Sequence, residues 1–384
     1  MVIKIKKKAE NLKRIILSIS RKKPVPLSIP YLDENDLFIV SKEIRENNVA
    51  LGNCIKKFEN EITKVTGSKN IILVSNGTLG LFATLLNEKI DNEYEILVPT
   101  LNYIASTNAI LGCKAVPHFI DSSKDDLGVD FKKLDNYLKK ITTIKKNYSI
   151  NKKTKRTIKA IMITHVFGHP NNMMEAKKIC KKYKLKLIED ASEALGSTYK
   201  NKHVGTYGDY GVISFNGNKI ITSGGGGAII VKKKSDFLKL KKIIDNGKKF
   251  DKFNFLHQCF GLNLRLPNLN ASLGYSQILK KKKKISQRRK LYKIYSKFSQ
   301  KGFEIMNEPT HAKSNFWLQA LKVNNQHEKN YLLNFLYKNK IQARSIWKPN
   351  HLFSHLKKFP KINLDNSLKI YNTTINIPSS LNVK

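Results

Sequence analysis

The sequence predicts an α/β fold with a mostly parallel sheet, followed by a smaller α+β domain. Short apolar runs alternate with helix-like segments up to about residue 232, as in strands joined by crossover helices. Beyond that point the alternation stops, and separate strand and helix signals fill the last part of the chain, FEIM, FWLQALKV, YLLNFLYKN and QARSIW. The length of 384 residues, 41% of them hydrophobic, is ample for one large and one smaller domain.

The first strand and its following turn resemble a phosphate site. Helix-like segments over about 36–47 and 54–66 precede the apolar run IILV, which is followed by Asn76-Gly77-Thr78 and an apolar helix. A strand, a short polar glycine turn and a helix together direct backbone N–H groups and a hydroxyl at a phosphate. The turn alone is also compatible with an ordinary strand–helix connection.

The next units place two more functional residue types near strand ends. Tyr103 begins a helix after the strand EILVP, where its ring could lie on a planar cofactor or simply in the core. TIKAIMITH and KLKLIED are predicted strands on either side of a helix near 172–184, after a lysine-rich surface loop at 145–157. Asp190 ends the second of these strands. Ligands of parallel α/β sheets bind at that end.

An isolated lysine stands out between two later strands. The window 203–231 contains a single lysine, Lys219, whereas the overall lysine content would place roughly five lysines there. GVISF and AIIV flank the lysine as buried strands, and Ser223 to Gly227 is a glycine tract that allows close backbone approach. Lys219 is therefore a candidate covalent nucleophile, although a lysine on a surface turn would show the same pattern.

These residues form a set that fits pyridoxal phosphate (PLP). The cofactor requires a phosphate cradle, a ring that stacks on it, a carboxylate beside its pyridine nitrogen and an amine that binds it covalently. The turn at 76–78, Tyr103, Asp190 and Lys219 supply these groups in that order.

The charge pattern weighs against a nucleic-acid-binding protein, and the cysteine spacing weighs against a disulfide-rich protein. The net charge is +42, but only eight of the 71 basic residues are Arg, and no aromatic residues are interleaved with the lysines in a stacking pattern. We therefore expect solvated faces and no nucleic-acid partner; a nucleic-acid-binding protein and a catalytically silent PLP-binding regulator are the alternatives. The four cysteines are widely spaced without a C-x-x-C pair, which fits a reducing, cytoplasmic setting.

Neither a metal site nor a membrane span is expected. His165 with His169 and His351 with His355 have metal-like spacing but lack a carboxylate in an H-E-x-x-H arrangement. Residues 1–24 are basic and amphipathic, but charges interrupt every apolar run. The favoured interpretation of this segment is an arm or helix that packs on the protein, and a helix on a membrane surface is the alternative.

The motifs taken together resemble the DegT/DnrJ/EryC1/StrS family of sugar aminotransferases. The resemblance is carried by SNGTLGL, VPTLNYIASTNAI, HVFGHPNNM, LIEDASEALGSTYKNKHVGTYGD, SFNGNKIITSGGGG, NLRLPNLNASLG and INIPSSLNV. It implies the PLP-dependent transferase fold type I, similar to aspartate aminotransferase. It further implies a three-layer αβα domain over 25–255 and a small C-terminal α+β domain with a linking helix over 256–384.

The resemblance also implies roles for individual residues. Lys219 would bind the cofactor covalently, Asp190 would pair with the pyridinium nitrogen, and Tyr103 would stack on the ring. Asn263 would reach the cofactor phosphate of a neighbouring subunit, which implies a homodimer with two shared sites. Glu193 stands where many members have Gln or His, so we include it as a cofactor contact without assigning its role. The phosphate would be held by Asn76, Gly77, Thr78 and Ser214.

The implied reaction is amino transfer and not dehydration, because members that dehydrate sugars carry a histidine in place of Lys219. The implied amino donor is L-glutamate. PVPLSIP, SFNGNKIITSGGGG and SIWKPNHL are most similar to the bacillosamine and legionaminic acid branch. The expected acceptor is the C4 ketone of a UDP-linked 4-keto-6-deoxy N-acetylamino sugar used for surface glycans. A GDP- or dTDP-linked sugar and amination at C3 stay open.

Overall fold

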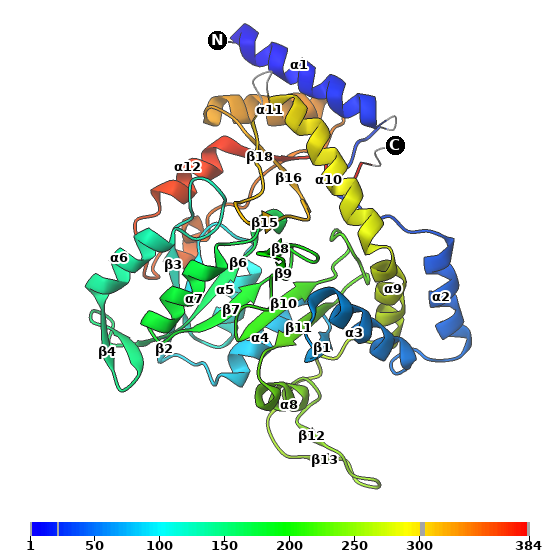
Figure 1. The fold of residues 1–384 in the computed structure, drawn as a ribbon, viewed down its shortest axis with the longest axis vertical. Helices are drawn as coiled ribbons and strands as arrows, with labels where there is room; N and C mark the ends of the chain where they lie inside the picture. The colour runs from blue at the N-terminus through cyan, green and yellow to red at the C-terminus, as the bar shows by residue number, and fades with distance from the viewer. Residues whose placement is uncertain (1, 21–22, 300–303, 382–384) are drawn as a thin grey trace.

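The computed structural model describes residues 2–20, 23–299 and 304–381, and its centre is a nine-stranded sheet (Figure 1). Seven strands follow the order β1-β11-β10-β7-β6-β2-β3, and the hairpin β4–β5 joins β6 at the side. The strands are β1 (Ile71–Val74), β2 (Tyr94–Pro99), β3 (Val116–Ile120), β4 (Thr142–Lys145), β5 (Tyr148–Asn151), β6 (Thr157–Thr164), β7 (Lys186–Asp190), β10 (Tyr210–Ser214) and β11 (Gly227–Val231).

The sheet is mostly parallel and covered on both faces. β3, β2, β6, β7 and β10 pair in parallel, whereas β11 runs antiparallel to both β10 and β1. Every residue of β1 and β11 is buried, although successive side chains of a strand point to opposite faces. Helices must therefore cover both faces, which confirms the predicted layered α/β architecture.

Helices of this part join the strands and pack in pairs. α4 contacts α5 and α8, α6 contacts α7, and α9 contacts α2 and α3. Gly67 ends α3 in the left-handed region (φ +74°), as the sequence predicts for a helix that stops at glycine. The helices are α2 (Glu34–Arg45), α3 (Asn53–Thr66), α4 (Gly77–Asn87), α5 (Ala105–Gly112), α6 (Phe131–Ile141), α7 (Met173–Lys182), α8 (Lys234–Ile243) and α9 (Asn268–Leu279).

The C-terminal part forms a second, smaller sheet with its own core. Its antiparallel strands have the order β14-β16-β18-β17, and a separate three-stranded sheet has the order β15-β8-β9. The bounds are β8 (Thr198–Tyr199), β9 (Lys202–His203), β14 (Glu304–Ile305), β15 (Ala312–Lys313), β16 (Gln319–Lys322), β17 (Arg344–Ser345), β18 (Thr374–Ile377), α10 (Lys281–Lys297), α11 (Gln326–Lys338) and α12 (Asp365–Thr373). A second cluster of buried apolar residues lies here, but other C-terminal residues belong to the main core, so the division into domains at 255/256 stays a prediction.

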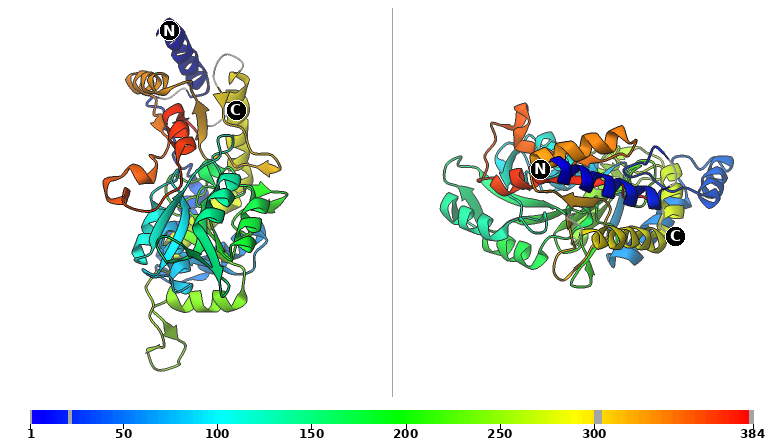
Figure 2. Two further views of the ribbon diagram at one scale, coloured as in Figure 1. Left: turned by 90° about the vertical axis from the view of Figure 1, so that its left-hand side faces the viewer. Right: turned by 90° about the horizontal axis from the view of Figure 1, so that it is seen from above.

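The N-terminal segment is a packing helix. α1 (Val2–Ile19) lies across α11 at one end of the molecule (Figures 1 and 2), and Lys8 pairs with Glu328 at 2.8 Å. Ala9, Leu12 and Ile16 are at most 2% exposed in the small core. The apolar face of the helix is thus already covered by protein, which favours the packing interpretation over the membrane-surface alternative. Within the described ranges, no helix is long and apolar enough to cross a membrane.

Two hairpins replace segments that the sequence did not resolve as strands. Part of the expected surface loop at 145–157 belongs to the β4–β5 hairpin, whose turn residues Lys146 and Asn147 both have positive φ, as a type I′ turn requires. A second hairpin, β12 (Lys248–Lys249) with β13 (Leu256–His257), projects from the body opposite α1 (Figures 1 and 2). The strands of both hairpins were not predicted, because strands on the surface can be rich in lysine and need no apolar run.

Candidate active site

The carboxyl ends of three strands bring predicted site residues to one edge of the sheet. β7, β10 and β1 run in the same direction, and Asp190 at the end of β7 pairs with Val212 of β10. Val74 and Ser214, which end β1 and β10, both lie opposite Gly227 of β11. The turn after β1 therefore starts beside the end of β10.

A cavity of about 600 Å³ opens at this edge and contacts both parts of the chain. Residues from the C-terminal part complete its wall, among them Trp317, Gln342, Arg344, Trp347 and Asn376. Eight of the nine predicted residues line the cavity, namely Asn76, Gly77, Thr78, Tyr103, Asp190, Glu193, Ser214 and Lys219.

Asn263 lies outside this cavity. It is exposed, in the segment before α9, and forms an isolated bridge with Asp245. Its proposed role concerns a second copy of the chain, so it stays a prediction.

The N-terminus of α4 has the features of a phosphate cradle. The side-chain oxygen of Asn76 caps the helix by accepting a hydrogen bond from Leu79 N at 2.8 Å. The first N–H groups of a helix lack partners within it, and the helix dipole favours an anion there. A Cβ on Gly77 would lie 3.1 Å from both Ser192 Oγ and Ser214 Cβ, so only glycine leaves this space open.

Two donors fix the carboxylate of Asp190. Ser106 Oγ donates to Oδ2 at 2.6 Å, and Ser192 N donates to Oδ1 at 3.1 Å. The residue is buried, and its backbone carbonyl accepts from His165 N at 3.1 Å. A buried, oriented carboxylate suits the role of holding a proton on a pyridine nitrogen.

Lys219 lies in the turn between β10 and β11, with its amine buried among aromatic and acidic side chains. Its Nζ is 3.7 Å from the centroid of the Trp317 ring and 3.9 Å from Glu193 Oε1. The indole N–H of Trp317 donates to Asn218 O at 2.8 Å, which anchors the turn. The alternative interpretation, in which the Lys219 side chain lies on the surface, is therefore wrong.

Burial shifts the protonation of both charged groups toward their neutral forms. Burial lowers the pKa of Lys219, and the charges of Glu193 and Asp190 only partly oppose it. Burial raises the pKa of Glu193 to about 7, against the effect of Lys219 and of the Phe167 N–H. A lowered pKa increases the fraction of neutral amine, which is the form that attacks an aldehyde and accepts a proton.

Glu193 also holds a strained turn in place. Its Oε2 accepts from Phe167 N at 2.6 Å, and Phe167 adopts the left-handed conformation (φ +55°) that costs a non-glycine residue about 1 kcal/mol. At the next position, Gly168 (φ +92°), a Cβ would come within 1.8 Å of Asn315 Oδ1. Glu193 thus has a structural role as well as a place in the cavity.

Aromatic rings form the wall opposite the sheet. Tyr103 is 55% exposed, and its ring lies edge-on to Trp347 with centroids 5.3 Å apart, so it flanks an open space instead of filling the core. Phe167 and Trp317 contact Trp347 at 5.6 and 6.4 Å.

Trp317, Trp347 and Ser106 were not predicted as site residues. The tryptophans belong to the C-terminal part, so no local pattern connects them to Lys219, although the SIWKPNHL motif marked the segment of Trp347. Ser106 lies inside the predicted helix, where a hydroxyl carries no distinguishing signal.

Comparison with known proteins agrees with this geometry. The family model of the DegT/DnrJ/EryC1/StrS aminotransferase family matches residues 30–384. The chain belongs to this family. It is therefore a PLP-dependent sugar-nucleotide aminotransferase, as predicted, and the identity of the sugar nucleotide is a separate question.

Individual relatives cover most of the aminotransferase. It is 32% identical to the GDP-perosamine synthase of Escherichia coli O157:H7, over 78% of each chain. It is 28% identical, over 90% of each chain, to the UDP-4-amino-4,6-dideoxy-N-acetyl-beta-L-altrosamine transaminase of Campylobacter jejuni strain 81-176. The Helicobacter pylori aminotransferase PseC has the same fold, with a TM-score of 0.84 at 24% identity over 94% of this chain and 95% of its own.

The residues of the aminotransferase fit PLP. The open space at Gly77 beside a helix N-terminus suits the phosphate, the fixed Asp190 suits the pyridine nitrogen, and Lys219 lines the same cavity, where it would supply the amine that binds the cofactor. Among the described residues, no group of three or more His, Cys, Asp or Glu side chains could hold a metal ion.

Lys219→Ala should abolish covalent attachment of PLP. Borohydride reduction of the PLP-loaded enzyme should fix the cofactor on the peptide that contains Lys219, as mass spectrometry would show. The variant should lack this adduct and lose at least about 10³-fold in turnover, because the same amine moves the substrate proton. Lys282→Ala, an exposed lysine on α10, is the control and should keep both. An adduct on another lysine would contradict the assignment.

The free energy of unfolding of the cofactor-free enzyme should fall as the pH rises, because Glu193 holds its proton more tightly in the folded state. Its folded-state pKa of about 7 exceeds the ordinary 4.5, so between these values the folded state holds a proton that the unfolded chain has lost. The free energy of unfolding should therefore fall between about pH 5 and 7.5, by up to about 3 kcal/mol.

Glu193→Gln should flatten this pH dependence in urea unfolding. Glu46→Gln, the same change at an exposed position, should leave it unaltered. Equal slopes for wild type and Glu193→Gln would show that Glu193 is not buried as a neutral acid.

Proposed function

We propose that the enzyme transfers the amino group of L-glutamate to C4 of a UDP-linked 4-keto-6-deoxy N-acetylamino sugar. The observation that carries this proposal is the Lys219 site with a polar wall beside the cofactor residues. Gln342, Arg344 and Asn376 line the same cavity and provide partners for sugar hydroxyls and for an anionic group. A relative whose name specifies a UDP-linked 4-amino-4,6-dideoxy sugar supports amination at C4.

The residues of the cavity supply the acid–base chemistry of both half-reactions. When bound, PLP supplies an electron sink for the carbanion formed at the substrate carbon. Lys219 Nζ removes the proton from the α-carbon of glutamate, and it returns a proton to the aminated carbon of the sugar in the second half. Asp190 keeps the pyridine nitrogen protonated, and the Trp317 ring lies over the Lys219 amine. Product release between the halves makes the kinetics ping-pong.

A GDP-linked keto sugar is the second candidate, because a GDP-perosamine synthase is 32% identical to this chain. Both acceptors carry a ketone at C4 and differ in the nucleotide and in the substituent at C2. Surface-glycan synthesis and a cytoplasmic location belong to this proposal. All four cysteines are free, as suits a reducing compartment.

The acceptor can be identified by direct competition. PLP-loaded enzyme with L-glutamate should convert UDP-2-acetamido-2,6-dideoxy-hexos-4-ulose to the 4-amino sugar nucleotide with a kcat/KM at least about tenfold above that for GDP-4-keto-6-deoxymannose. Mass spectrometry and NMR of the products give both the conversion and the aminated carbon. A preference for the GDP sugar would overturn the UDP assignment and leave the amino-transfer reaction intact.

We also propose a homodimer in which each subunit completes the other's site. Large apolar side chains are exposed on two regions, Leu37 and Phe38 of α2 and Phe250, Phe253 and Phe255 of the β12–β13 hairpin, each at least 63% exposed. Exposed apolar groups of this size are typical of protein interfaces. Asn263, close in sequence to the hairpin, would extend into the partner's cavity.

Mixing two inactive variants tests this arrangement. Lys219→Ala and Asn263→Ala subunits should each be impaired alone. When they are mixed one to one and allowed to exchange, half of the dimers should be mixed, with one intact site each. About one quarter of the wild-type activity should therefore return if Asn263 acts across a twofold interface. No recovery in confirmed mixed dimers would place Asn263 within its own subunit's site or outside catalysis.

A further inference from the structure

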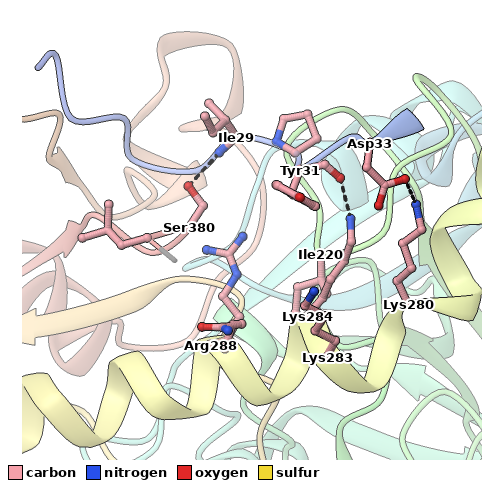
Figure 3. A pocket seen from close by; sticks show the side chains of 12 residues that line it. Ile29, Tyr31, Asp33, Ile220, Lys280, Lys283, Lys284, Arg288 and Ser380 are labelled. Atoms are coloured by element: carbon pink, nitrogen blue, oxygen red, sulfur yellow. Dashed lines mark hydrogen bonds and ion pairs between the residues drawn. The ribbon is translucent and has the colours of Figure 1, made fainter. Parts of the chain in front are cut away.

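A second cavity, of about 470 Å³, lies between the segment 29–33 and helix α10 (Figure 3). It shares no lining residue with the active-site cavity. One side is basic and comes from successive turns at the start of α10, and the other is mainly apolar. Lys283, Lys284 and Arg288 line the basic side, and Ile29, Tyr31 and Ile220 line the apolar side.

Arg288 is buried with an unused donor group. The residue is 7% exposed, and its Nη1 has no hydrogen-bond partner among the described residues. Its Nη2 donates to Ser28 Oγ at a long 3.4 Å. Figure 3 shows the guanidinium extending into the space below Ile29 and Tyr31. A buried guanidinium with an unpaired N–H is costly unless an anion accepts from it.

Two lysines add uncompensated positive charge to this cavity. Lys280 is already paired with Asp33 and, at 2.9 Å, with Asp36. In the part of the chain that the structure describes, no ion pair joins a carboxylate to Lys283, Lys284 or Arg288. Lys284 donates to Tyr31 O at 2.9 Å, and burial together with the nearby Lys280 and Arg288 lowers its pKa to about 8. The excess of positive charge is therefore concentrated on this side of the cavity.

Hydrogen bonds through Ser28 and Asn218 connect the residues of the two cavities. Ser28 Oγ, which accepts from Arg288, donates to Asn218 O at 3.1 Å, and the same carbonyl accepts from Trp317 Nε1. Lys219 faces the active site from this turn, while Ile220 lines the second cavity. An occupant on Arg288 would thus lie directly behind the turn that carries the catalytic amine.

We propose that this cavity is a binding site for a phosphate-bearing small molecule other than PLP. The guanidinium of Arg288 and the amines of Lys283 and Lys284 would bind the phosphate, since a guanidinium matches phosphate oxygens in geometry and charge. Ile29, Ile220 and the ring of Tyr31 would contact the carbon part of the ligand. The shared chemistry is the phosphoryl group, whether it comes from a free phosphate or from a nucleotide.

The test is calorimetric titration of the PLP-loaded enzyme, whose cofactor cradle is filled, with pyrophosphate and with UDP at constant ionic strength. Both probes should bind saturably. Lys284→Gln and Arg288→Met should weaken binding at least about tenfold, whereas Lys282→Gln, exposed on the same helix and outside the cavity, should not. If Arg288→Met fails to fold, a Lys283→Gln, Lys284→Gln double variant gives the same information.

Arg344→Gln in the active-site cavity separates the two sites. It should leave the binding that depends on Lys284 intact. Tighter binding of UDP than of pyrophosphate, lost in the Lys284→Gln variant, would identify a nucleotide as the ligand, and equal affinities would indicate a free phosphate. Absence of saturable binding, or binding that only Arg344→Gln weakens, would overturn the proposal.

Discussion

Burial of an amine beside two carboxylates is the constraint on which the rest of this structure depends. Lys219, Glu193 and Asp190 lie together at the carboxyl edge of the sheet, where removal of water from each charge is costly. Neighbouring groups offset that cost: a tryptophan ring lies over the amine, two donors hold Asp190, and the Phe167 N–H holds Glu193. The strained turn at Phe167 persists because this carboxylate holds it.

The two parts of the chain depend on each other through the same cavity. The sheet and its connections supply the helix N-terminus, the carboxylate and the lysine, but Trp317 and Trp347 of the aromatic wall come from the C-terminal part. Trp317 contacts the amine through its ring and anchors the lysine's turn through its N–H. The position of Lys219 is thus set from both sides, which gives a physical reason for the small domain to pack against this edge of the sheet.

The sequence was sufficient for the layered α/β fold and for the cofactor because each depends on local patterns. The strand runs, the turn at 76–78 and the absence of other lysines around Lys219 can all be read within short windows. Trp317 and Ser106 could not be found in this way, since their contacts with the site arise only when distant segments pack. The hairpins were missed because their strands lie on the surface and carry lysines. The role of Asn263 depends on a second subunit, so neither the sequence nor a single chain determines it.

The most direct test of the central claim is exchange of the α-proton of L-glutamate in D₂O. The PLP-loaded enzyme is incubated with glutamate and no sugar acceptor, and NMR follows the α-proton while 2-oxoglutarate is measured. If Lys219 Nζ is the base, as we propose, the wild-type enzyme should exchange the proton and release at most one equivalent of 2-oxoglutarate per chain, and PLP-loaded Lys219→Ala should do neither. Exchange by the variant at the wild-type rate would contradict the account.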